Sequence, residues 1–112
     1  MIPVDQTTFG VPNGNCFSAC IASILHMPIA DVPSFCKHED WWERLTAWLQ
    51  PHGYYPTIIR HNPEWTPRGF HVLSGKSPRG DFQHSVVALG PDIIHDPHPS
   101  RSGIEDRLDI VL

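Results

Sequence analysis

The most informative stretch of this chain is residues 14–25, GNCFSACIASIL. It begins as a glycine-containing turn and continues as an apolar segment with helical spacing, so we expect a helix from about Cys16 to Leu25. Asn15 is predicted to cap this helix, because its side-chain oxygen can accept a backbone N–H of the first turn. Cys16 then takes the first helical position, where the positive end of the helix favours a thiolate over a thiol. This position is typical of a cysteine nucleophile.

A base and an orienting group follow much later in the chain. Residues 82–90, FQHSVVALG, predict a strand with His84 near its start, and residues 90–92 predict a turn. The returning strand is expected over Ile93–Asp96. Such a hairpin brings His84 and Asp96 close together on neighbouring strands. A cysteine, then a histidine, then a carboxylate is the chain order of the papain-like hydrolases, whose functional groups meet only in the fold.

Taken with Gln6 and the run His95-Asp96-Pro97, these motifs resemble the minimal core of the papain-like cysteine peptidases. The chain is similar in this respect to the cysteine peptidase domain of bacteriocin-processing exporters and its small stand-alone relatives. A second resemblance is to uncharacterised small proteins of bacteria and their phages. It is carried by the Gly-Asn-Cys-Phe start and by residues 96–100, DPHPS, and it implies no substrate.

The peptidase resemblance implies a role for four residues. Cys16 would be the nucleophile, His84 the base and Asp96 the group that orients His84. The side-chain amide of Gln6 would form an oxyanion hole together with the backbone N–H of Cys16. Gln6 precedes Cys16 by ten residues, a longer gap than the family usually has, so we expect residues 9–14 to loop out. No cofactor or metal is required.

The order of the predicted elements indicates an α+β domain. After the first helix, one helical turn is expected near Ile29, and a second helix from about Trp41 to Leu49 with Asp40 as its N-cap. The later segments have strand character: Tyr54–Ile59, Phe70–Ser74, Phe82–Leu89, Ile93–Asp96 and Leu108–Leu112. We therefore expect a single minimal papain-like domain over residues 1–112, with the N-terminal helix packed on an antiparallel sheet.

Composition excludes several classes of protein. A formal net charge of −4 without a basic block disfavours nucleic-acid binding. No apolar run approaches the roughly 20 residues of a membrane-spanning helix, and the N-terminus lacks the features of a signal peptide, so cytoplasmic residence is expected. Three cysteines are an odd number, which argues against a disulfide framework and fits a reducing compartment. The oligomeric state is left open.

The sequence thus predicts a cysteine-dependent hydrolase or acyl transferase that acts on an amide, isopeptide or thioester bond of a peptide or protein. The alternative is a non-enzymatic phage or bacterial effector that uses the same fold to bind a host protein. A third interpretation, a zinc or thiol site at Cys16 and Cys20, lacks the usual pairs of closely spaced ligands, and Cys20 is expected in the core. His71 is the rival base. Arg101 is expected either to meet a substrate carboxylate or to be solvated.

Overall fold

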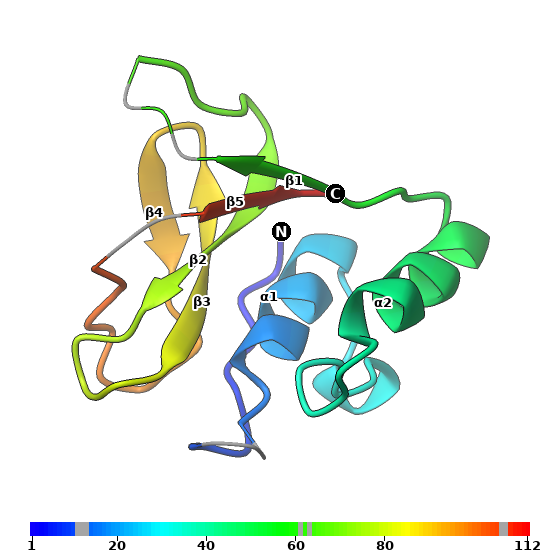
Figure 1. The fold of residues 1–112 in the computed structure, drawn as a ribbon, viewed down its shortest axis with the longest axis horizontal. Helices are drawn as coiled ribbons and strands as arrows, with labels where there is room; N and C mark the ends of the chain where they lie inside the picture. The colour runs from blue at the N-terminus through cyan, green and yellow to red at the C-terminus, as the bar shows by residue number, and fades with distance from the viewer. Residues whose placement is uncertain (11–13, 61, 63, 106–107) are drawn as a thin grey trace.

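Two helices precede a five-stranded sheet in the computed structural model, which describes residues 1–10, 14–60, 62, 64–105 and 108–112 (Figure 1). The helices are α1 (Cys16–Leu25) and α2 (Trp41–Leu49), with short 3-10 turns η1 (Ile29–Asp31) and η2 (Gln50–His52). The strands are β1 (Thr57–Arg60), β2 (Phe70–Lys76), β3 (Gln83–Leu89), β4 (Asp92–His95) and β5 (Leu108–Val111). This arrangement confirms the α+β class and both predicted helices.

The sheet is antiparallel throughout, with the strand order β1-β5-β2-β3-β4. The last strand of the chain, β5, therefore lies between β1 and β2. Strands β3 and β4 form the predicted hairpin, in which Leu89 pairs with Asp92 across a two-residue turn. Gly90 has a φ of 58° in this turn, a conformation that glycine adopts without steric cost.

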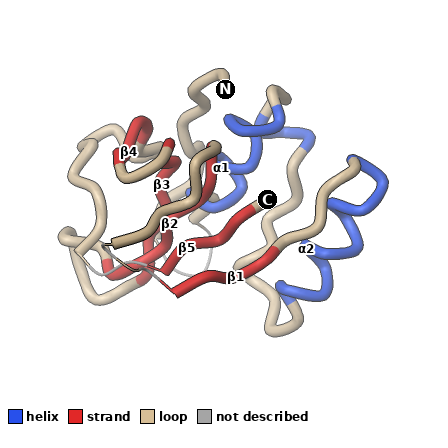
Figure 2. The backbone as a smooth tube through the Cα atoms, turned by 90° about the horizontal axis from the view of Figure 1, so that it is seen from above, coloured by secondary structure: helices blue, strands red, loops and turns tan. Residues whose placement is uncertain are grey.

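The main core lies between the sheet and the helices. Val72 and Val87, which pair across β2 and β3, contact Phe17 and Ile21 of α1, and α2 adds Leu45. Figures 1 and 2 show α1 against the sheet, with α2 beyond it. Burying a side chain of this size stabilises the fold by about 1.5–3 kcal/mol.

The opposite face of the sheet has its own small core. Side chains alternate along a strand, so Leu73 and Val86 point away from the helices. They are buried there with Ala88, and Ile93 and Ile104 pack against them. The loop that follows β4 thereby covers this face. No helix in the described part of the chain is both long and apolar enough to cross a bilayer.

Asn15 and Asp40 are the N-cap residues of α1 and α2, as predicted, but neither side chain makes the expected capping hydrogen bond, because each has found a different partner. Asn15 precedes α1, but its Oδ1 accepts the backbone N–H groups of Thr7 and Thr8 at 2.9 and 3.0 Å. Asp40 precedes α2, but its carboxylate binds Nε of Arg44 at 2.7 Å, one helical turn away. The Asn15 bonds hold the N-terminal segment against the start of α1.

Strand boundaries differ from the prediction by up to three residues. β1 begins at Thr57 rather than Tyr54, directly after Pro56, whose missing N–H cannot join a ladder. β2 continues to Lys76 because residues 74–76 pair with the start of β3. These differences leave the predicted hairpin intact.

Candidate active site

The N-terminal segment brings Gln6 to the start of α1. The backbone N–H of Val4 donates to Oγ of Ser23 at 2.9 Å, which lays the segment along α1. The chain then loops back: the N–H of Gly14 donates to the Gly10 carbonyl at 2.8 Å, and a Cβ at Gly14 would lie only 2.5 Å from that oxygen. Residues 11–13 of this predicted loop lie outside the described residues. The return of the chain brings Gln6 to Cys16 although Gln6 precedes Cys16 by ten residues.

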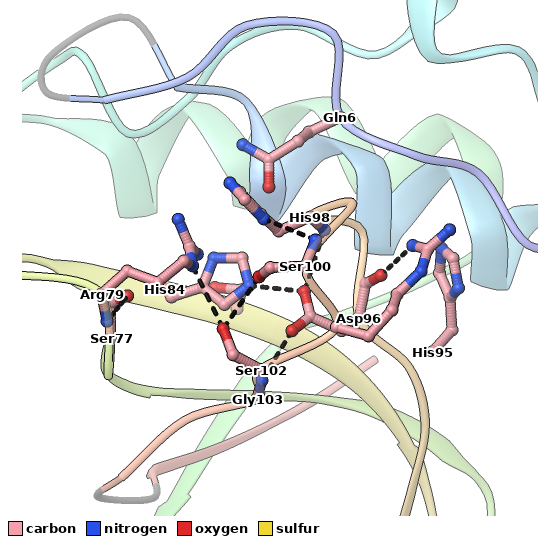
Figure 3. A network of polar contacts seen from close by, with 12 residues as sticks. Gln6, Ser77, Arg79, His84, His95, Asp96, His98, Ser100, Ser102 and Gly103 are labelled. Carbon is pink, nitrogen blue, oxygen red and sulfur yellow. Dashed lines mark hydrogen bonds and ion pairs between the residues drawn. The ribbon is translucent and has the colours of Figure 1, made fainter.

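Cys16, His84 and Asp96 meet at one end of the sheet. Cys16 is half-buried at the first residue of α1, and His84 is the second residue of β3. Asp96 directly follows β4 in the predicted hairpin, and its Oδ1 accepts a hydrogen bond from Nε2 of His84 at 2.7 Å (Figure 3). Because Nε2 is used in this way, Nδ1 is the nitrogen left for Cys16. Cys16 lies close enough to His84 to help raise the pKa of the imidazole.

The environment of Asp96 keeps its carboxylate ionised. It accepts two backbone N–H groups, from His98 at 2.9 Å and Gly103 at 2.7 Å, in addition to His84. Burial opposes the charge, but these hydrogen bonds outweigh burial and lower the pKa of Asp96 to about 2. Burial also opposes a charged His84, but hydrogen bonds with Asp96 and Cys16 raise the pKa of His84 to about 9. The pair is therefore ionised at neutral pH.

Gln6 lies beside this group with its side chain 7% exposed. Its Nε2 donates to the Thr8 carbonyl at 3.0 Å, and because an amide nitrogen carries two hydrogens, one remains for another acceptor. Its Oε1 is buried and has no hydrogen-bond partner among the described residues. Figure 3 shows Gln6 on the α1 side of His98 and His84. The structure therefore brings all four predicted site residues together.

A cleft of about 580 Å³ opens beside these residues. Sheet register gives its course: Ser85 on β3 pairs with Ser74 on β2, and Ile110 on β5 pairs with Ile58 on β1. The cleft therefore crosses the helix-facing side of the sheet from His84 to the edge strand. Its walls are lined by Gln6, Gly10, Gly14, Cys16, Phe17, Cys36, Lys37, Trp41, Ile58, Ser74, Arg79, Asp81, Phe82, Gln83, His84, Ser85 and Ile110.

The character of the cleft changes along its length. Near His84, the hydroxyl groups of Ser74 and Ser85 bond to each other at 2.8 Å. Toward the edge strand the sheet side of the cleft becomes apolar, with Ile110 and Ile58, and Trp41 at the start of α2 also lines the cleft. Sequence reasoning assigned none of these residues to a site, because their approach depends on strand register.

Other candidates from the sequence lie elsewhere. His71 is buried on β2, where its Nδ1 donates to the Gly69 carbonyl at 2.9 Å, and it does not line the cleft. Cys20 is fully buried in the core, as predicted. Arg101 pairs with Asp5, a partner that neither predicted alternative included. Within the described ranges, no three His, Cys, Asp or Glu side chains are grouped so that they could hold a metal ion.

Cys16 is expected to be the fastest of the three cysteines to react with an alkylating agent. Burial raises the pKa of Cys20 well above its ordinary value, and desolvation by surrounding protein atoms raises that of Cys36 to about 11 although Cys36 is exposed. Mass-spectrometric mapping after limited iodoacetamide treatment checks this order. In the His84→Ala control, labelling of Cys16 should slow while labelling of Cys36 stays constant. Preferential labelling of Cys36 in the wild type would contradict the prediction.

The comparisons with known proteins add no relative to this geometry. No family model, no curated protein and no solved structure matches the chain.

Proposed function

We propose that this chain is a papain-like cysteine hydrolase or acyl transferase acting on an amide, isopeptide or thioester bond. One observation carries the proposal. A buried His84–Asp96 pair, hydrogen-bonded at 2.7 Å, lies beside Cys16 at the N-terminus of α1, and Cys16 and His84 border an open cleft. A nucleophile, a base and a group that orients the base are the parts that covalent acyl transfer requires.

The reaction would proceed in two steps. Sγ of Cys16 attacks the carbonyl carbon, and the resulting oxyanion accepts hydrogen bonds from Nε2 of Gln6 and the backbone N–H of Cys16. Nδ1 of His84 gives its proton to the leaving amine or thiolate as the bond to the carbonyl carbon breaks, which leaves a thioester on Cys16. His84 then takes a proton from water or an acceptor amine, which attacks the thioester and releases Cys16.

The cleft supports a peptide or protein as the substrate. It is long enough to cross four strands, and its apolar end beside Ile58 and Ile110 suits an apolar side chain of the substrate. The thiol of Cys16 must stay reduced for this chemistry, which fits the cytoplasm. The proposed chemistry uses only side-chain and backbone groups of this chain.

Trapping of the thioester tests the function directly. The protein is incubated with peptidyl thioesters and peptidyl aminocoumarin amides that vary in the residue next to the scissile bond, and intact mass is recorded after acid quench. An acyl adduct on Cys16 with release of product supports the proposal. Acylation of the Cys16→Ala variant to the same extent, or no adduct and no product from any substrate, would overturn it. A Cys36→Ala variant controls for a second thiol at the cleft.

Gln6→Ala is expected to lower kcat by about 10²-fold, the usual cost of losing one oxyanion donor. KM should change little, because the oxyanion forms only in the transition state. Steady-state kinetics on the best substrate measure both constants. Gln83→Ala is a matched control, since Gln83 also lines the cleft but lies on the exposed start of β3. Equal losses in the two variants would remove Gln6 from the oxyanion site.

A further inference from the structure

The loop after β4 wraps around the carboxylate of Asp96. The backbone N–H groups of His98 and Gly103 both donate to that carboxylate, so the loop must hold a fixed curve between them. Arg101 lies on this curve with a φ of 53°, a left-handed conformation that costs energy for a residue with a Cβ. Its backbone N–H donates to the His98 carbonyl at 3.0 Å. The backbone hydrogen bonds of the loop and the contacts of the Arg101 side chain together hold this conformation.

Those contacts reach the other end of the chain. The guanidinium of Arg101 binds the carboxylate of Asp5 with two hydrogen bonds, of 2.7 and 3.0 Å. The same guanidinium also donates to the backbone carbonyl of Asp96. These bonds lower the pKa of Asp5, because the Arg101 guanidinium stabilises its charge. One planar group thus links the orienting residue of the site to the residue that precedes Gln6.

Backbone contacts tie the same two segments together. The N–H of Gln6 donates to the Pro97 carbonyl at 3.0 Å. Nε2 of His95 donates to the Val4 carbonyl at 2.9 Å and lies 3.3 Å from Oδ1 of Asp5. The segment that carries Gln6 is therefore bonded to the residue before Asp96 and to the residue after it.

We propose that Asp5 and Arg101 are positioning residues that hold Gln6 and Asp96 in fixed places relative to each other. The inference rests on the proposed function, because it concerns the oxyanion donor and the orienter of that reaction. The two side chains are 46% and 49% exposed, and exposed ion pairs contribute little to stability. We therefore attribute to the Asp5–Arg101 pair an effect on the positions of Gln6 and Asp96, because a small displacement of a catalytic group can lower the rate by about 10²-fold.

Arg101→Asn is the sharpest variant, because asparagine tolerates the left-handed backbone while the guanidinium contacts are lost. Asp5→Asn tests the same link from the other side and leaves the loop unchanged. The matched control is Arg44→Gln, which removes an Arg–Asp pair of the same 2.7 Å length and similar exposure on α2, away from the cleft. Each variant is compared with the wild type in kcat/KM, in the NMR titration of His84 and in the rate of Cys16 alkylation.

Both site variants are expected to lower kcat/KM about tenfold, to lower the pKa of His84 and to slow alkylation of Cys16, while thermal unfolding and the Arg44→Gln control stay near the wild type. Combining Asp5→Asn with Arg101→Asn should lose little more than either alone, since both remove one link. Unchanged kcat/KM and unchanged His84 titration in both variants would overturn the proposal.

The readouts separate this proposal from the proposed function. If the wild type turns over no acyl substrate but the two variants still shift the His84 titration and slow Cys16 alkylation, the positioning role stands without the hydrolase. If the wild type turns over substrate and the variants match it, the hydrolase stands without the positioning role.

Discussion

Cys16→Ala is expected to lower kcat/KM by about 10⁴-fold or more, because it removes the sulfur atom that forms the acyl intermediate. The fold should persist. Cys16 is half-buried at the edge of the cleft, and alanine is a good helix former, so thermal unfolding should shift by only a few degrees. Steady-state kinetics and a thermal melt of the same preparation measure both quantities.

Cys36→Ala is the control for this variant, since Cys36 also lines the cleft but lies outside α1. It should keep wild-type turnover. A large loss of stability in Cys16→Ala would identify Cys16 as a structural core residue. Retained turnover in that variant would show that another group performs the attack.

Asp96→Ala is expected to have the largest effect on stability, a loss of about 3 kcal/mol in the free energy of unfolding near pH 6. The substitution leaves His84, only 2% exposed, without its counter-charge, and it leaves the N–H groups of His98 and Gly103 without their acceptor. Turnover falls for the same reason, because the His84 imidazolium is no longer oriented or stabilised. Urea unfolding and steady-state kinetics measure the two losses.

The loss in the free energy of unfolding should depend on pH, and the pKa values of Asp96 and His84 predict how. Asp96 has a folded pKa of about 2, below the unfolded value near 3.9, so its stabilisation is present above about pH 4 and disappears as pH falls toward 2. His84 has a folded pKa of about 9, above the unfolded value near 6.5, so its stabilisation is present below about pH 6.5 and disappears as pH rises through 9. The difference between wild type and Asp96→Ala should therefore be largest between about pH 4 and 6.5.

Further variants rank the contributions of His84 and Asp96 to catalysis by the loss of turnover that each causes. Asp96→Asn should be milder than His84→Ala, because an amide oxygen still accepts the bond from Nε2, and Asp96→Ala should fall between them. The high-pH limb of kcat/KM, near pH 9 in the wild type where His84 loses its proton, should move to lower pH in Asp96→Ala. An NMR titration of the His84 ring that is unchanged in Asp96→Ala would remove Asp96 from the site.

Elements whose cause is local could be predicted from the sequence. Apolar spacing and flanking residues predicted α1 over Cys16–Leu25 and α2 over Trp41–Leu49, with the bounds that the structure has. The turn residues around Gly90 predicted the hairpin, which brings the strand that carries His84 beside the segment that carries Asp96. Each of these features depends on interactions within one helix or between strands joined by a short turn.

Which distant segments complete the site depends on packing and could not be predicted from the sequence. β5 enters the sheet between β1 and β2, which forms the apolar end of the cleft at Ile110 and Ile58. Asn15 binds Thr7 and Thr8 instead of capping α1, and Arg101 binds Asp5 from the other end of the chain. A polar side chain accepts whichever partner the fold brings within about 3 Å, and residue spacing in the sequence carries no information about partners that only packing brings together.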